Sequence, residues 1–157
     1  MARELSPGLG GVTQVYGQVA TGGAVGSFKT EGTKSEYTLH LTGEVLQTRL
    51  ISPVRIPAGT VIKRATLRVT QAFDLATSSV VRVGTSGAEA ANGVSLTEAQ
   101  LEAVGYVDVT ASLNGAFAAN AVLAANTLLG IAFTAGSVTN RNVGKAVLVI
   151  ETERVIA

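Results

Sequence analysis

The sequence contains no cysteine, no tryptophan and a single histidine, His40. Without cysteine the chain can form no disulfide and offers no thiolate ligand to a metal. A lone histidine also lacks partner ligands, because the chain has only two aspartates, Asp74 and Asp108. We therefore predict no metal centre and no bound cofactor, and we expect His40 to lie on the polar face of a strand.

A charge excess and long apolar runs are also missing, which excludes further classes of partner. Twelve basic residues face eleven acidic ones, whereas nucleic-acid-binding proteins usually carry a concentrated basic surface. No apolar segment approaches the roughly 20 residues of a membrane-spanning helix, and the opening "MARELSPGLGG" lacks the apolar core of a secretory signal. We expect a protein made in a bacterial cytoplasm, with neither nucleic acid nor a membrane as its partner.

Catalytic motifs are absent as well. A Ser–His–Asp triad could be drawn on paper from His40 with Asp74 or Asp108, but no G-x-S-x-G turn supplies the nucleophile. The segment "GTSG" at residues 84–87 has a different spacing and is typical of a turn. No glycine cluster is followed by the Lys-Ser/Thr pair of a phosphate-binding loop. We predict that the chain is not an enzyme and has no catalytic residue.

What the sequence does contain is short stretches of alternating apolar and polar residues. The hydrophobic share is 46% and the aromatic share only 4%, so a core must be built from Val, Leu, Ile and Ala. From residue 36 onward the alternation has the period of two that half-buried strands show. The residues that it assigns to inward faces are Tyr37, Leu39, Leu41, Val61, Ala65, Leu67, Val69, Val81, Val83, Val107, Val109, Leu129, Ile131 and Phe133, with Lys63 as an exception.

The last stretch, "KAVLVIETERV" at residues 145–155, differs because its first half is apolar on both faces, which is typical of a central, covered strand. Gly, Pro, Asn and Ser separate these strands. The pattern predicts an all-β fold, an antiparallel β-sandwich or jelly-roll-like body.

At most one short helix is expected, in "SLTEAQLEAVG" at residues 95–105. Ser95 with Glu98 forms the pattern of a capping box, and Gly105 is placed to end the helix. Glu98 and Glu102 lie one helical turn apart, which we interpret as a solvated helix face. The stretch "ASLNGAFAANAVLAAN" at residues 111–126 is predicted to be a loop with one turn.

Two segments resemble each other. "RIPAGTVI" at residues 55–62 and "VLAANTLLGI" at residues 122–131 both place an apolar residue, a turn of small residues, a threonine and then a strand. We interpret this as shared turn chemistry rather than as a true repeat.

The first 35 residues differ from the remainder in having many glycines and no lasting periodicity. We divide the chain into an extended N-terminal arm, residues 1–35, and a β-sandwich body, residues 36–157. Two interpretations of the first segment stay open: a long surface loop, or an arm that contacts neighbouring chains. Apolar side chains spaced along it are candidate contacts, namely Leu5, Leu9, Val12, Val15, Tyr16, Val19 and Phe28.

Three arginines of the body are further candidates for partner contact. Arg64, Arg68 and Arg82 all lie on polar faces of predicted strands, and we expect them to share one outer sheet face. Arginine is enriched at interfaces, although it also protects sheet edges from aggregation. Tyr16 and Tyr106 are the tyrosines left for carbohydrate stacking, which supports that function weakly.

The run "SPVRIPAGTVIKRATLRVTQAFDLATSSVVRVGTSGAEAANGVSL", residues 52–96, resembles segments of tailed-bacteriophage virion proteins, especially small capsid decoration (cement) proteins. The shared pattern is the "IPAGTVI" turn, an alternating strand ending in "AFD", and "VRVGTSG". It is a pattern of turns and strands and includes no catalytic signature.

The resemblance implies a protein of the virion capsid surface that binds the outer capsid lattice and stabilises the head. Its partners would be the major capsid protein and copies of itself, as a homo-oligomer for which a trimer is one expected form. Another virion component, in the tail, a fibre or the head–tail connection, is the alternative, followed by a carbohydrate- or ligand-binding β-sandwich module.

Overall fold

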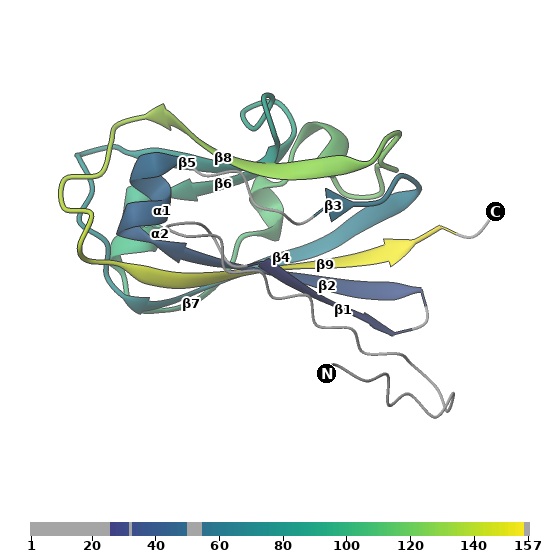
Figure 1. The fold of residues 1–157 in the computed structure, drawn as a ribbon, viewed down its shortest axis with the longest axis horizontal. Coiled ribbons are helices and arrows are strands. Elements are labelled where there is room, and N and C mark those ends of the chain that lie inside the picture. The colour runs from purple at the N-terminus through teal and green to yellow at the C-terminus, as the bar shows by residue number, and fades with distance from the viewer. Residues whose placement is uncertain (1–25, 32, 50–54, 156–157) are drawn as a thin grey trace, which may run out of the picture.

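The computed structural model describes residues 26–31, 33–49 and 55–155 (Figure 1). Within these residues two antiparallel sheets pack face to face as the layers of a sandwich (Figure 1). One sheet has the order β1 (Gly26–Glu31), β2 (Lys34–Thr42), β9 (Lys145–Arg154), β4 (Thr60–Gln71) and β7 (Gly105–Asp108). The other has the order β3 (Arg55–Ile56), β8 (Thr127–Ala135), β5 (Val80–Thr85) and β6 (Gly93–Thr97). The predicted all-β sandwich is confirmed.

The strand pairing is that of a jelly roll with β1 added at one edge. The antiparallel pairs β2 with β9, β3 with β8, β4 with β7 and β5 with β6 are nested inside one another. They correspond to one long hairpin whose tip is the β5–β6 turn. When this hairpin rolls up, β9 meets β4 and β8 meets β5, which closes the two sheets.

The two similar segments form the corner where this long hairpin passes from one sheet to the other. Residues 55–62 and residues 122–128 run antiparallel, with Ile56 opposite Thr127 and Val61 opposite Val122. Between these pairs the Gly59 N–H donates to the Leu123 carbonyl at 2.8 Å. Gly59 has φ +79°, a value that favours glycine. Both segments must bend at the same corner, and this explains why their sequences share a turn and a threonine.

The core lies between the sheets and is mostly aliphatic, as the composition predicts. The inward positions of β2 and β5 are confirmed, since Tyr37, Leu39 and Leu41 and also Val81 and Val83 are buried. Phe133 is only partly buried; the Arg49 guanidinium carbon lies 5.8 Å from the centre of its ring. Of the other predicted inward residues, Val107 is partly buried and the remainder are buried.

Lys63 interrupts the alternation because β4 has an irregular register at that point. Ile62 lies opposite Thr152 and Arg64 opposite Glu151, so Lys63 is an extra residue in the strand. The bulge shifts the facing, and fully buried Ile62 joins the core cluster in place of Val61. The assignment of Val61 to the core face is therefore wrong, although Val61 is buried at the corner beside Val122.

The predicted helix exists, but its boundaries and cap are different. Helix α2 spans Glu98–Glu102, and its capping box is formed by Thr97 and Gln100 rather than by Ser95 and Glu98. Ser95 belongs to β6, because the strand continues to Thr97 in pairing with β5. Two short 3-10 turns, Thr110–Ser112 and Gly115–Phe117, occupy the stretch that was predicted to be a loop with one turn.

The two glutamates of α2 are bonded to the protein and do not form a purely solvated face. The Glu98 carboxylate accepts the Ser78 N–H, and the Glu102 carboxylate accepts the Leu75 N–H at 3.0 Å. Carboxylates that accept backbone N–H groups order the segment that donates them. The pair thus fixes the loop between β4 and β5.

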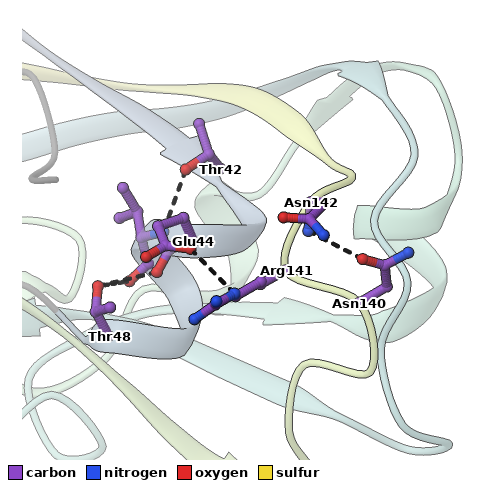
Figure 2. A network of polar contacts seen from close by, with 7 residues as sticks. Thr42, Glu44, Thr48, Asn140, Arg141 and Asn142 are labelled. Atoms are coloured by element: carbon purple, nitrogen blue, oxygen red, sulfur yellow. Dashed lines mark hydrogen bonds and ion pairs between the residues drawn. The ribbon is translucent and has the colours of Figure 1, made fainter.

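A second helix, α1 (Gly43–Thr48), was not predicted, because "TGE" read as the end of a strand. The Thr42 hydroxyl caps it by accepting the Val45 N–H at 3.1 Å (Figure 2). Arg141 Nε lies 3.6 Å from Glu44 Oε2 and ties the helix to the loop before β9 (Figure 2). A Cβ at Gly43 would lie 2.4 Å from the Val143 carbonyl oxygen, so this close approach requires glycine. No helix of the described residues is long and apolar enough to span a membrane.

Part of the segment predicted as the arm belongs to the five-stranded sheet. Residues 26–31 form β1, which pairs with β2 along its whole length, from Gly26 opposite Leu39 to Glu31 opposite Lys34. The sheet thus begins ten residues before Glu36, where the body was predicted to start. Residues 1–25 lie outside the described residues, and the division into arm and body stays a prediction.

Candidate partner-binding surface

The outer face of the five-stranded sheet carries three rows of side chains. Each row crosses β2, β9 and β4, and two rows continue onto β7, as the strand register requires. The first row contains Glu36, Glu151 and Arg64; the second contains Thr38, Val149, Thr66 and Asp108; the third contains His40, Val147, Arg68 and Tyr106. Polar and charged groups therefore surround a short apolar stripe on β9.

A shallow groove runs over these rows. Thr66, Val147 and Val149 form its centre, with Glu36 and Glu151 at one end and Arg68 and Tyr106 at the other. Thr66 is buried although it faces outward, whereas Tyr106 is 65% exposed. A broad groove with an apolar floor and charges of both signs at its rim has the composition of a protein contact surface.

Glu36 and Glu151 also line a second hollow, next to this groove, in which basic residues take part. Its lining includes Lys34, Lys63 and Glu153. The two adjacent glutamates repel each other across the strands, and the nearby lysines offset that repulsion. The Lys63 ammonium lies 3.9 Å from the Glu153 carboxylate. Among the described residues, no ion pair includes Glu36 or Glu151.

Arg64, which lies on β4 on the same outer face, forms an ion pair with a residue of β7. Its Nε lies 3.4 Å from the Asp108 carboxylate. Hydrogen bonds from Thr110 hold the pKa of Asp108 below its usual value, and the charge of Arg64 acts in the same direction. Because both partners are about half exposed, this pair orients β7 against β4 more than it stabilises the fold.

The expectation that Arg64, Arg68 and Arg82 share a face is wrong. Arg64 and Arg68 project from β4 on the outer side of the five-stranded sheet. Arg82 lies on β5, in the opposite sheet. Because Val81 and Val83 on either side of it are buried in the core, Arg82 projects from the other outer face of the sandwich.

Most of the candidate contacts in the arm fall outside the described residues. These are Leu5, Leu9, Val12, Val15, Tyr16 and Val19. Residue 28 is placed by the structure in β1, opposite Tyr37 of β2.

Sequence reasoning missed the stripe on β9. The strand is central, as predicted, but Val147 and Val149 on its outer side are partly exposed instead of covered. The first half of β9 is apolar on both faces. This pattern indicates a strand that is covered on both sides, either by the same chain or by a partner. Tyr106 could not be placed beside them, because the pairing of β7 with β4 is non-local.

His40 is exposed on β2, as predicted. Asp108 lies three strands away across β9 and β4, roughly 14 Å at the usual strand spacing. Among the described residues no three His, Cys, Asp or Glu side chains gather as metal ligands would. The arrangement of this sheet face suits contact between protein surfaces.

Replacing His40 with alanine is expected to change the free energy of unfolding by no more than about 0.5 kcal/mol, as for other exposed sites. Urea denaturation of both proteins measures the difference. A much larger loss would mean that the imidazole makes a structural contact that its exposed position hides.

Comparisons with known proteins give one structural likeness. No protein-family model and no curated protein matches the sequence. The fold is similar to a chain of the Cyanophage Pam1 capsid asymmetric unit, with a TM-score of 0.46 and 20% sequence identity, over 98% of this chain and 94% of that chain.

Proposed function

We propose that this chain is a virion structural protein of a tailed bacteriophage, and more specifically a capsid decoration protein that binds the outer capsid lattice and stabilises the head. The observation that carries the proposal is the resemblance of residues 52–96 to such proteins, together with where that segment lies. It contains β3, β4, β5 and β6, which contribute strands to both sheets of the jelly roll. The shared pattern is thus the framework of the body.

The interior favours a structural role over an enzymatic one. Jelly rolls occur in viral capsid proteins, in lectins and in cupins, so the fold alone does not assign a function. Between these sheets lies a packed core of aliphatic side chains with a few aromatic ones. Apart from the outward-facing Thr66, the buried polar side chains of the described residues are also hydroxyls: Thr60, Ser79, Thr127 and Thr152, with Tyr37 in the core itself. Such an interior supplies rigidity and no acid, base or metal ligand.

The exterior supports binding to other proteins. The groove on the five-stranded sheet, with Val147, Val149 and Tyr106, offers apolar area that remains partly exposed in the single chain. On a closed symmetric shell many modest contacts act together, so each copy needs only a small surface of this kind. The major capsid protein and further copies of this chain are the proposed partners.

Co-sedimentation tests this proposal directly. Purified protein is mixed with expanded, genome-free capsids of the phage that encodes it and, separately, with isolated tails. We expect saturable binding to capsids, and capsids that withstand higher temperature once coated. Binding to tails alone would favour a tail or head–tail component instead, and binding to neither, with hits on a glycan array, would favour carbohydrate recognition through Tyr106.

A further inference from the structure

The groove on the outer face of the five-stranded sheet carries opposite charges at its two ends. At one end Glu36 of β2 lies directly across from Glu151 of β9. At the other end Arg68 of β4 lies across from Tyr106 of β7. None of the ion pairs between described residues includes Glu36, Glu151 or Arg68. Each end of the groove can therefore still pair with an opposite charge.

The two ends are too far apart to neutralise each other within one copy. Arg68 lies two strands and two rows away from Glu36 in the strand register. At the usual spacings of a sheet this separates their backbones by roughly 17 Å. Arg64, which lies in the same row as the glutamates, already pairs with Asp108. An opposite charge for either end must come from another molecule.

Apolar area is also left uncovered on this side of the molecule. Val104 and Tyr106, on either side of Gly105, are 66% and 65% exposed, which makes them the most exposed large hydrophobic residues of the described chain. Val147 and Val149 on the floor of the groove are partly exposed. Apolar residues that gather at one place on a surface mark a contact with another molecule more often than scattered ones do.

We infer that this face binds the same face of a second copy, in a two-fold symmetric dimer in which the Arg68 and Tyr106 end of each groove lies on the Glu36 and Glu151 end of the other. This rests on the proposed function, in which further copies of the chain are one of two partners. A two-fold interface requires a surface that complements itself. Rotation about an axis that crosses the groove exchanges its two ends, so each charge meets its opposite.

Charge complementarity favours a second copy over other occupants. A uniformly acidic or basic partner would match one end of the groove and be repelled by the other. A phosphate backbone would be repelled by Glu36 and Glu151. In the dimer the Tyr106 ring of one copy covers the apolar stripe of the other, and its hydroxyl is directed toward the partner's carboxylates, which suits a side chain with an apolar body and a polar tip.

The face has the area that a weak dimer needs. Its five strands, about 4.8 Å apart, and the nine residues of β2, at about 3.4 Å each, span roughly 700 Å². Each partner contributes about 800 Å² to an interface of standard size. We therefore expect a dimer that dissociates in dilute solution and forms where many copies are held close together, as on a capsid.

Sedimentation velocity of the purified protein over a wide range of concentrations tests the inference without capsids. The wild type should pass from monomer to dimer as the concentration rises. Arg68→Glu makes both ends acidic and should weaken the dimer about tenfold or more. Adding Glu36→Arg to that variant should restore most of the loss, because opposite charges then meet again. Arg55→Glu, at an exposed position on β3 of the other sheet, is the matched control and should dimerise as the wild type does.

Disulfide cross-linking identifies the occupant of the groove. The chain contains no cysteine, so a single introduced cysteine can link only to its own copy in another molecule. Val149 lies at the centre of the groove, where the two-fold axis brings each residue close to its counterpart. Val149→Cys should therefore form a disulfide-linked dimer under mild oxidation. Arg55→Cys, on the other sheet, should not.

Each outcome decides a different point. Wild type that stays monomeric at every concentration overturns this inference and leaves the groove to the capsid protein or to residues 1–25 of the chain, while the proposed function is still decided by capsid co-sedimentation. A dimer that survives Arg68→Glu, or that Glu36→Arg does not restore, also overturns it, as does equal cross-linking of the two cysteine variants. A dimer with all the expected properties that does not bind capsids overturns the proposed function alone.

Discussion

Replacing Leu67 with aspartate is expected to abolish soluble, folded protein. Leu67 is fully buried in the middle of β4, opposite Leu148 of β9 and Val107 of β7. The change removes about 1.5–3 kcal/mol of apolar burial and adds the larger cost of placing a carboxylate where no cation or donor is available. Together these approach the whole stability of an ordinary domain, about 5–15 kcal/mol.

The matched control is Arg68→Asp, which introduces the same side chain one residue further along the strand. Arg68 is exposed on the outer face, so the cost there should be limited to about 1 kcal/mol of strand preference. Soluble yield, circular dichroism and the urea midpoint compare the two variants. Equal tolerance of both would mean that the faces of β4 are assigned the wrong way round.

Deleting residues 1–25 is expected to leave the β-body folded and to weaken capsid binding at least tenfold, or about 1.4 kcal/mol. The described strands of both sheets lie between Gly26 and Arg154 and pair with one another. The deleted segment contains most of the apolar candidates for partner contact, from Leu5 to Val19. Ordering such a segment costs on the order of 1 kcal/mol per residue, and we expect apolar contacts with a partner to offset that cost.

Circular dichroism, thermal unfolding and capsid co-sedimentation of the truncated chain give the answer. A full-length variant with Val12 and Val15 changed to serine separates the loss of apolar contacts from the loss of chain length. Salt should have little effect on the contribution of this segment, since Arg3 and Glu4 are its only charged side chains. An unfolded truncation would show that the segment belongs to the body, and normal capsid binding would show that it is not the contact.

The alternation in the sequence determined which side of each strand meets the core. Side chains two residues apart project from the same face of a strand, and a chain with few aromatic residues can fill its core only with aliphatic ones. These two facts were enough to place Tyr37, Leu67, Val81 and Ile131 in the interior, and His40 and Arg68 outside it.

The local sequence pattern was not sufficient to predict the bulge in β4 or the capping box of α2. The bulge at Lys63 moved Ile62 into the core cluster because β4 must keep pairing with β9 on both sides of it. The capping box shifted from Ser95 to Thr97 because β6 remains paired with β5 up to that residue. In both places a neighbouring strand, distant in the sequence, decided the boundary.

The candidate surfaces depended most on the tertiary structure. Alternation alone shows that Arg64, Arg68 and Arg82 are outward-facing, but their strands are joined to different sheets by pairings between segments far apart in the chain. Only the rolled hairpin brings Tyr106 beside Arg68 and places Arg82 on the opposite face of the sandwich. The period of a strand is a property of neighbouring residues, whereas the sheet that it joins follows from how the whole chain closes its core.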